Sequence, residues 1–198
     1  MIYFSNPDYK TATNAAYKVL AERDWFSFET NVFGIIEQLE NCRLYTYALA
    51  NFWYDIPLDV LQANSEYGFS ITRNDQRIIY YNETMPLPCV RFTLAHEIGH
   101  AVLGHKNADD PVAEKEANCF ARNLLCPVPV ASAMQLESAS DYASVFNVSN
   151  QMARVAIDRR KSDAYYLNNT YSEIIHNKVY AFNMGYASLS QFERYMLA

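Results

Sequence analysis

The sequence has no Cys-x-x-Cys pair, although it contains four cysteines, Cys42, Cys89, Cys119 and Cys126. Zinc sites built on thiolates usually draw on closely spaced cysteine pairs, so we do not expect these residues to bind a metal. The simplest interpretation of their spacing is four reduced, buried thiols in a cytoplasmic protein.

Two kinds of hydrophobic segment are also missing. The first residues, Met-Ile-Tyr-Phe-Ser-Asn-Pro, contain no basic stretch that leads into an apolar run, so we expect no signal peptide. The sequence has no run of about 18 apolar residues, so we expect no membrane span. It also contains no low-complexity run and no internal repeat.

The chain has fewer basic than acidic residues. The chain has 16 Lys and Arg residues against 22 Asp and Glu residues, which gives a net charge of −6. A protein that binds nucleic acid through its phosphates needs a positive surface, so this balance argues against direct nucleic-acid binding. An acidic protein would still tolerate a basic protein partner.

What the chain does contain is enough apolar material for a folded core. Hydrophobic residues make up 51% of the 198 residues and aromatic residues 15%, which is too many for a disordered chain. This length predicts one domain, or one domain with a small appendage. We expect residues 1–135 to form the main domain, with N-terminal helices, and residues 136–198 to form a helical extension on the same core.

One stretch carries an obvious chemical pattern, His-Glu-x-x-His from His96 to His100. Apolar residues at helical spacing predict a helix over residues 89–103, and Gly104 follows as a helix-ending residue. Residues four apart share a helix face, so both imidazoles can bind one metal ion, Zn²⁺ being the best match. Glu97 can then reach a metal-bound water and act as the catalytic base. The motif also occurs by chance on surface helices.

The third ligand is less obvious. In metzincin proteases the motif continues after its second His as x-x-Gly-x-x-His. Gly104 and His105 do not stand at those positions. His105 would point about 140° away from His100 on an ideal helix. We therefore interpret His105 as structural, or as a residue that supports a ligand from behind.

A second helix, predicted over residues 113–125, offers a carboxylate. Glu114 shares a face with small residues that would let this helix approach the first, so Glu114 is our preferred third ligand. Asn118 lies one turn further on and could hydrogen-bond a ligand. Glu116 is the alternative third ligand, although it projects about 200° away from Glu114. Both carboxylates could also be ordinary surface groups.

The two stretches together resemble the ImmA/IrrE family of zinc metallopeptidases. The similar residues are Arg-Phe-Thr-Leu-Ala-His-Glu-Ile-Gly-His-x-x-Leu-Gly-His, followed by Glu-x-Glu-Ala-Asn-x-Phe-Ala-x-x-Leu-Leu-x-Pro. The resemblance extends over about residues 28–160. One departure is Cys126, where family members usually carry Met. The resemblance implies that the substrate is a helix-turn-helix transcriptional repressor of a mobile element, prophage or stress response.

The segments before the first metal helix have the character of strands. Residues 43–52 are rich in Tyr and apolar residues, and residues 68–72 and 77–82 flank a polar turn, as in a hairpin. We therefore predict an α+β fold, with a small, mostly antiparallel three-stranded sheet packed on a zincin-like helical core. By resemblance to related proteases, an edge strand would pair with extended substrate. The candidate residues for that strand are Arg77, Ile78, Ile79 and Tyr80.

Residues 143–161 fit two helices around an Asn-Val-Ser turn, the second capped by Ser149. This pattern also resembles a DNA-reading helix-turn-helix. A similar helix pair follows the catalytic part in the ImmA/IrrE family, so we interpret it as structural or partner-facing. The remaining histidine, His176, is expected to be an ordinary surface residue.

Three functions remain open at this point. The first is a cytoplasmic zinc endopeptidase that cuts a repressor, with His96, His100 and Glu114 as ligands of one Zn²⁺ ion. The second is a metal-containing module that binds and sequesters a repressor without cutting it. The third is a DNA-binding regulator, which the acidic net charge opposes. The presence of Glu97 favours the first, because binding alone does not require a base.

Overall fold

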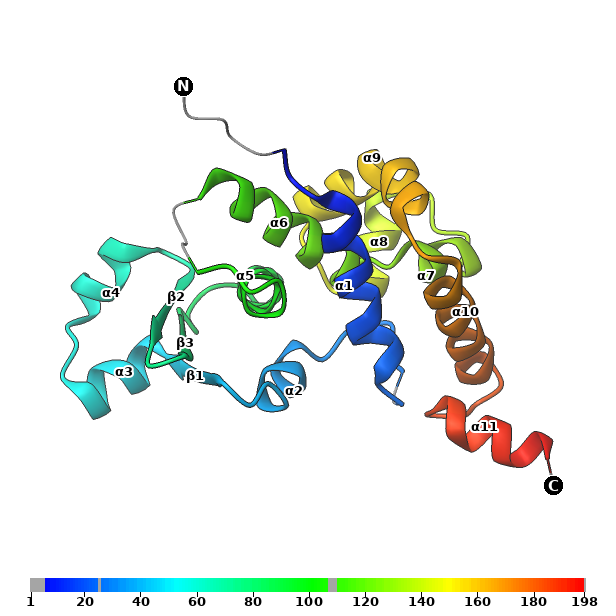
Figure 1. Cartoon of the computed structure of the whole chain (residues 1–198), viewed down its shortest axis with the longest axis horizontal. Helices are drawn as coiled ribbons and strands as arrows, with labels where there is room; N and C mark the ends of the chain where they lie inside the picture. The colour runs from blue at the N-terminus through cyan, green and yellow to red at the C-terminus, as the bar shows by residue number, and fades with distance from the viewer. Residues whose placement is uncertain (1–5, 25, 107–109, 198) are drawn as a thin grey trace. The chain divides into compact units, whose positions relative to one another are not determined.

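A computed structural model describes residues 6–24, 26–106 and 110–197 (Figure 1). The chain divides into two compact units. Unit 1 is built on Asn31–Ala121, and unit 2 combines Asp8–Thr30 with Arg122–Ala198. The first helix falls in the same unit as the C-terminal helices, and the expected boundary after residue 135 stays a prediction.

Unit 1 is an α+β structure with a small sheet, as the sequence predicts. Its elements, in chain order, are α2 (Val32–Glu37), β1 (Cys42–Thr46), α3 (Tyr47–Tyr54), α4 (Leu58–Asn64), β2 (Gly68–Arg73), β3 (Gln76–Tyr81), α5 (Leu87–Val102) and α6 (Pro111–Leu125). The last of these, α6, continues four residues beyond the end of the unit.

The sheet has the strand order β1-β3-β2, with β1 parallel and β2 antiparallel to β3. It is therefore mixed, where the sequence predicted a mostly antiparallel sheet. The hairpin between β2 and β3 forms as predicted, because Asn74 and Asp75 adopt positive φ angles of 51° and 59°. Two such residues form the tight turn whose twist matches that of paired strands.

The central position of β3 overturns one prediction. Arg77, Ile78, Ile79 and Tyr80 lie in β3, which pairs with β1 on one side and with β2 on the other. A strand with both neighbours in place has no free backbone groups to offer an extended peptide. These residues are therefore not an edge strand for substrate, and the edges of the sheet are β1 and β2.

The predicted strand over residues 43–52 is also shorter than expected, because β1 ends at Thr46 and α3 begins at Tyr47. The Thr46 hydroxyl accepts a hydrogen bond from the Leu49 amide. The Glu83 carboxylate accepts two more, from the amides of Tyr47 and Ala48 at 3.1 and 3.2 Å. These contacts satisfy amides that a new helix leaves free, so they decide in favour of a helix over the Tyr-rich segment.

The sheet separates two groups of helices (Figure 1). On one face, Tyr80 belongs to a buried cluster with Tyr47, Ala50 and Leu61 from α3 and α4. On the other face lies α5, whose residues contact β2 and β3. Because side chains alternate along a strand, the neighbours of Tyr80 in β3 point toward α5. The helix α5 therefore packs against this face of the sheet.

Unit 2 consists of helices in the part that the structure describes, apart from a single bridge residue at Ser188. Its helices are α1 (Tyr9–Glu22), α7 (Val128–Ala133), α8 (Ala139–Phe146), α9 (Asn150–Tyr166), α10 (Asn169–Asn183) and α11 (Leu189–Met196). Ser149 caps α9, as predicted, by accepting a hydrogen bond from the Met152 amide at 3.1 Å. A buried ion pair joins Arg122 to Asp163, with two nitrogen–oxygen distances of 2.7 and 2.8 Å.

Among the described helices, none is both long and apolar enough to cross a lipid bilayer.

Candidate metal centre

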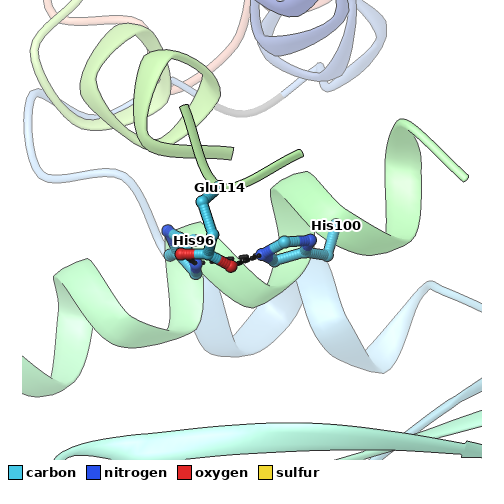
Figure 2. Close-up of side chains that lie close together, drawn as sticks. All are labelled: His96, His100 and Glu114. Carbon is cyan, nitrogen blue, oxygen red and sulfur yellow. Dashed lines mark hydrogen bonds and ion pairs between the residues drawn. The ribbon is translucent and has the colours of Figure 1, made fainter. Parts of the chain in front are cut away.

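The helix α5 presents three polar side chains from its second half, Leu94–Val102, which is otherwise apolar. His96 and His100 lie one turn apart, and Figure 2 shows both imidazoles directed toward Glu114. Glu97 is adjacent to His96 in sequence, so its side chain leaves the helix on another side. The His-Glu-x-x-His spacing thus directs two imidazoles one way and one carboxylate another.

Glu114 reaches the two imidazoles from the first turn of α6. The close approach of the two helices depends on small residues. Ala117 and Ala121 of α6 are fully buried, and α5 offers Gly99 at the contact. A methyl group added at Gly99 would lie 3.2 Å from the Ala117 Cα atom. The sequence predicted this small-residue face, and the packing follows it.

The three side chains converge on one point. His96 Nε2 lies 3.0 Å from His100 Nε2 and 3.4 Å from a Glu114 oxygen. The other Glu114 oxygen lies 3.0 Å from His100 Nε2. Two zinc ligands at ordinary bond lengths in a tetrahedral site lie about 3.3 Å apart. Two nitrogens and a carboxylate at these separations therefore match the donor atoms of a zinc-type site.

The hydrogen bond behind His96 supports the same conclusion. Its Nδ1 atom lies 3.1 Å from the Asn118 side-chain oxygen, which can only accept a hydrogen. Nδ1 therefore carries the hydrogen, and in the neutral ring Nε2 presents its lone pair to the cluster. Such a bond to the far nitrogen is typical of metal-binding histidines.

Glu116, the alternative third ligand, does not join this cluster. One of its carboxylate oxygens lies 3.0 Å from His105 Nε2. The other nitrogen of His105, Nδ1, is 3.0 Å from His100 Nδ1. Within the described ranges, His96, His100 and Glu114 are the one group of three or more side chains whose donor atoms lie close enough to share an ion.

The surroundings shift the pKa values of the two histidines in opposite directions. Burial and the neighbouring His96 lower the pKa of His100 to about 4, so this ring is neutral at pH 7. Burial also opposes the charged form of His96. The hydrogen bond with Glu114 and the charge of Glu97 outweigh it and raise the pKa of His96. Hydrogen bonding to His96 lowers the pKa of Glu114, which favours an ionised carboxylate facing two imidazoles.

Glu97 lies against the sheet and is only 7% exposed. Burial raises the pKa of its carboxyl group, while a hydrogen bond with the Ser70 side chain lowers it in part. The Arg77 guanidinium donates to the Ser70 hydroxyl over 2.8 Å and also to the backbone carbonyl of His105. A buried carboxylate beside a serine and an arginine is therefore held in a defined position, close to the cluster.

Sequence reasoning missed this support for Glu97. No pattern in the sequence indicates Ser70, and the resemblance to related proteases implies a substrate strand at Arg77. Ser70 lies between Phe69 and Ile71 in β2, and Arg77 follows Gln76 at the start of β3, so neither local pattern indicates a residue beside Glu97. His176 lies on α10, exposed, with its Nδ1 atom 2.7 Å from the Ser172 carbonyl oxygen.

A His-Glu-x-x-His helix whose two imidazoles meet a carboxylate from the next helix is the arrangement of a metallohydrolase site. Comparison with protein families agrees with this class. Residues 57–158, just over half of the chain, match the Peptidase_M78 model, described as an IrrE N-terminal-like domain. The protein therefore belongs to the Peptidase_M78 family of metallopeptidases. No curated protein matches the chain at a significant level.

Proposed function

We propose that the protein is a zinc-dependent endopeptidase with His96, His100 and Glu114 as metal ligands and Glu97 as general base. The observation that carries this proposal is the convergence of two imidazole nitrogens and a carboxylate within 3.0 to 3.4 Å of one another. Membership of a peptidase family supports a protein substrate.

The roles of the protein groups follow from their positions. A zinc ion held by the three ligands supplies a Lewis acid that activates water and polarises the scissile carbonyl. Glu97 accepts a proton from the attacking water and returns it to the leaving amine. The raised pKa of Glu97 suits this role, because the carboxyl group must hold the proton that it takes from water until it passes it to the leaving amine. The Ser70 hydroxyl holds the Glu97 carboxylate in the position from which it does both.

The substrate we propose is a helix-turn-helix transcriptional repressor, which the resemblance to the ImmA/IrrE family supports. Cleavage of a repressor would make the protein a regulator of transcription that acts in the cytoplasm. A repressor carries a basic, DNA-binding surface, and the acidic net charge of −6 favours association with such a partner.

The experiment compares the parent with Glu97→Gln, which has nearly the same shape but cannot take up the proton. Each protein is loaded with zinc and incubated with a repressor encoded beside its gene, and with a peptide library whose products are read by mass spectrometry. We expect the parent to cut at defined positions. The variant should retain one equivalent of zinc and lose at least about 100-fold of the cleavage rate.

The outcomes distinguish the competing functions. Cleavage by Glu97→Gln at the parental rate would show that another group is the base. Tight binding of an intact repressor by both proteins, with no cleavage, would replace the peptidase with a sequestering module. A chelator-treated parent serves as the control for a contaminating protease, because its activity should return only when zinc is added.

A further inference from the structure

We propose that His105 is a positioning residue for His100, and that Glu116 holds His105 in that role. In this arrangement a carboxylate sets the tautomer of a metal-binding histidine through a second imidazole. The inference rests on the proposed metal site, and it assigns the two polar residues that the catalytic mechanism leaves unused.

The positions of the hydrogens in the row Glu116–His105–His100 follow from Glu116, which is the acceptor at one end. Glu116 is a carboxylate, so the 3.0 Å contact with His105 Nε2 requires the hydrogen on that nitrogen. In the proposed arrangement His105 is neutral, so its other nitrogen, Nδ1, carries no hydrogen. Since His105 Nδ1 lies 3.0 Å from His100 Nδ1, the hydrogen between them belongs to His100. The remaining nitrogen of His100, Nε2, is left with a free lone pair.

That lone pair points to the cluster. His100 Nε2 lies 3.0 Å from both His96 Nε2 and a Glu114 oxygen. The opposite tautomer of His100 would place a hydrogen on Nε2, where the metal ion would be. Asn118 sets the tautomer of His96 by direct contact. The tautomer of His100 is set by Glu116 through the intervening His105. Both ligands thus present the same nitrogen by different routes.

The backbone of His105 is fixed as well. Its amide donates to the His100 carbonyl over 3.0 Å, and its carbonyl accepts from the Arg77 guanidinium. Gly104 makes this return possible, because it has a φ of +70°, a conformation that costs glycine little. The imidazole of His105 is 10% exposed, so it is held between α5 and α6 with little contact with water. A ring fixed in this way can orient its neighbour.

The test measures zinc affinity rather than cleavage, by competition with a chromophoric chelator. The variants are His105→Phe, which removes both nitrogens, His105→Gln, whose amide oxygen can accept from His100, and Glu116→Gln. We expect His105→Phe to weaken zinc binding about 10- to 100-fold, and Glu116→Gln by a smaller factor. His105→Gln should bind zinc more tightly than His105→Phe. His176→Phe is the matched control, because it removes an exposed histidine from α10, outside the cluster.

A second readout separates positioning from general damage. The visible absorption of bound cobalt reports the geometry of the metal, so it should change in His105→Phe and not in His176→Phe. Zinc affinity and cobalt spectra equal to those of the parent in both His105 variants and in Glu116→Gln would overturn the inference. If the parent itself bound no zinc, the proposed metal site would fail instead. If His105→Phe did not fold, the comparison of His105→Gln and Glu116→Gln with the control would decide.

Discussion

Gly99 is the residue on which the spacing of the two metal-binding helices depends. A β-carbon at this position would lie 3.1 Å from the Phe120 ring and 3.2 Å from the Ala117 Cα atom. These contacts are tighter than side chains normally make, and one of them is with the backbone of α6. An added methyl group would therefore push α6, and Glu114 with it, away from α5.

Gly99→Ala tests this packing. Alanine favours a helix over glycine by about 0.5–1 kcal/mol, whereas overpacking a buried contact costs about 1–3 kcal/mol. We expect the packing cost to dominate, so that the variant loses about 1 kcal/mol of stability in urea unfolding. Zinc affinity should fall about tenfold, because a ligand is displaced by a few tenths of an ångström. A variant as stable as the parent, with unchanged affinity, would show that the helices are not in such close contact.

Among individual residues, the sequence predicts those whose spacing along one helix defines the site. It does not predict the residues that other elements contribute. His96, Glu97 and His100 are recognisable because the helical repeat alone places them. Glu114 could be proposed from the small residues on its helix face, although Glu116 could not be excluded. Ser70 and Arg77 could not be found, because their proximity to Glu97 depends on how two strands pair beneath α5.

Among the helices, α1 ends against a charged side chain from α10. The Lys178 ammonium group donates to the backbone carbonyls of Leu20 and Ala21 at 2.8 and 2.9 Å, and also to that of Arg23. The last carbonyls of a helix have no partners within the helix, so Lys178 satisfies them and meets the negative end of the helix dipole. The residue is only 2% exposed.

This buried cap predicts a dependence of stability on pH. Burial lowers the pKa of Lys178 from 10.5 to about 8, with Asp24 raising it and Arg23 lowering it further. Between pH 8 and 10 the unfolded chain therefore binds more protons than the folded chain, and stability rises with pH. We expect the free energy of unfolding of the parent, relative to Lys178→Met, to increase by about 1 kcal/mol from pH 7.5 to 9.5.

The measurement is a series of urea unfolding curves for both proteins at matched pH values. Taking the difference between the two proteins cancels the tyrosines and other groups that titrate in both. Lys18→Met is the control, since Lys18 lies on the exposed side of α1 beside Glu22 and its loss removes one charge and no buried contact. A difference between parent and Lys178→Met that stays constant, or decreases, as pH rises would contradict the expected titration.

Element types could be predicted where periodicity was strong. The helices predicted over residues 89–103 and 113–125 are observed at Leu87–Val102 and Pro111–Leu125. The strand expected over residues 43–52 was cut short because Glu83, distant in sequence, caps the helix that replaces its second half. The parallel pairing of β1 with β3 was missed for a similar reason. It joins residues more than 30 positions apart, and no local pattern specifies it.

For the molecule as a whole, the division into two units falls inside α6. The same helix carries Glu114 in unit 1 and Arg122 in unit 2, where Arg122 pairs with Asp163. The ligands of the proposed zinc ion all lie in unit 1, on α5 and α6. Zinc would therefore add a further link between two helices that also meet through small residues and through the contacts of Asn118 and Glu116, and its binding energy would add to the stability of the fold.

This linkage gives a prediction that needs no substrate. Zinc that binds only the folded chain, supplied at about 100 times its Kd, adds about 2.7 kcal/mol to stability. For a chain of this size, that corresponds to a rise in Tm of roughly 5–10 °C over chelator-treated protein. Glu114→Gln is the comparison, because it replaces one of three donor groups with a weaker one and preserves the shape of the side chain. We expect less than half of the parental rise in the variant at the same zinc concentration. An equal rise in both proteins would mean that zinc stabilises the chain from some other position, and Glu114 would lose its place among the ligands.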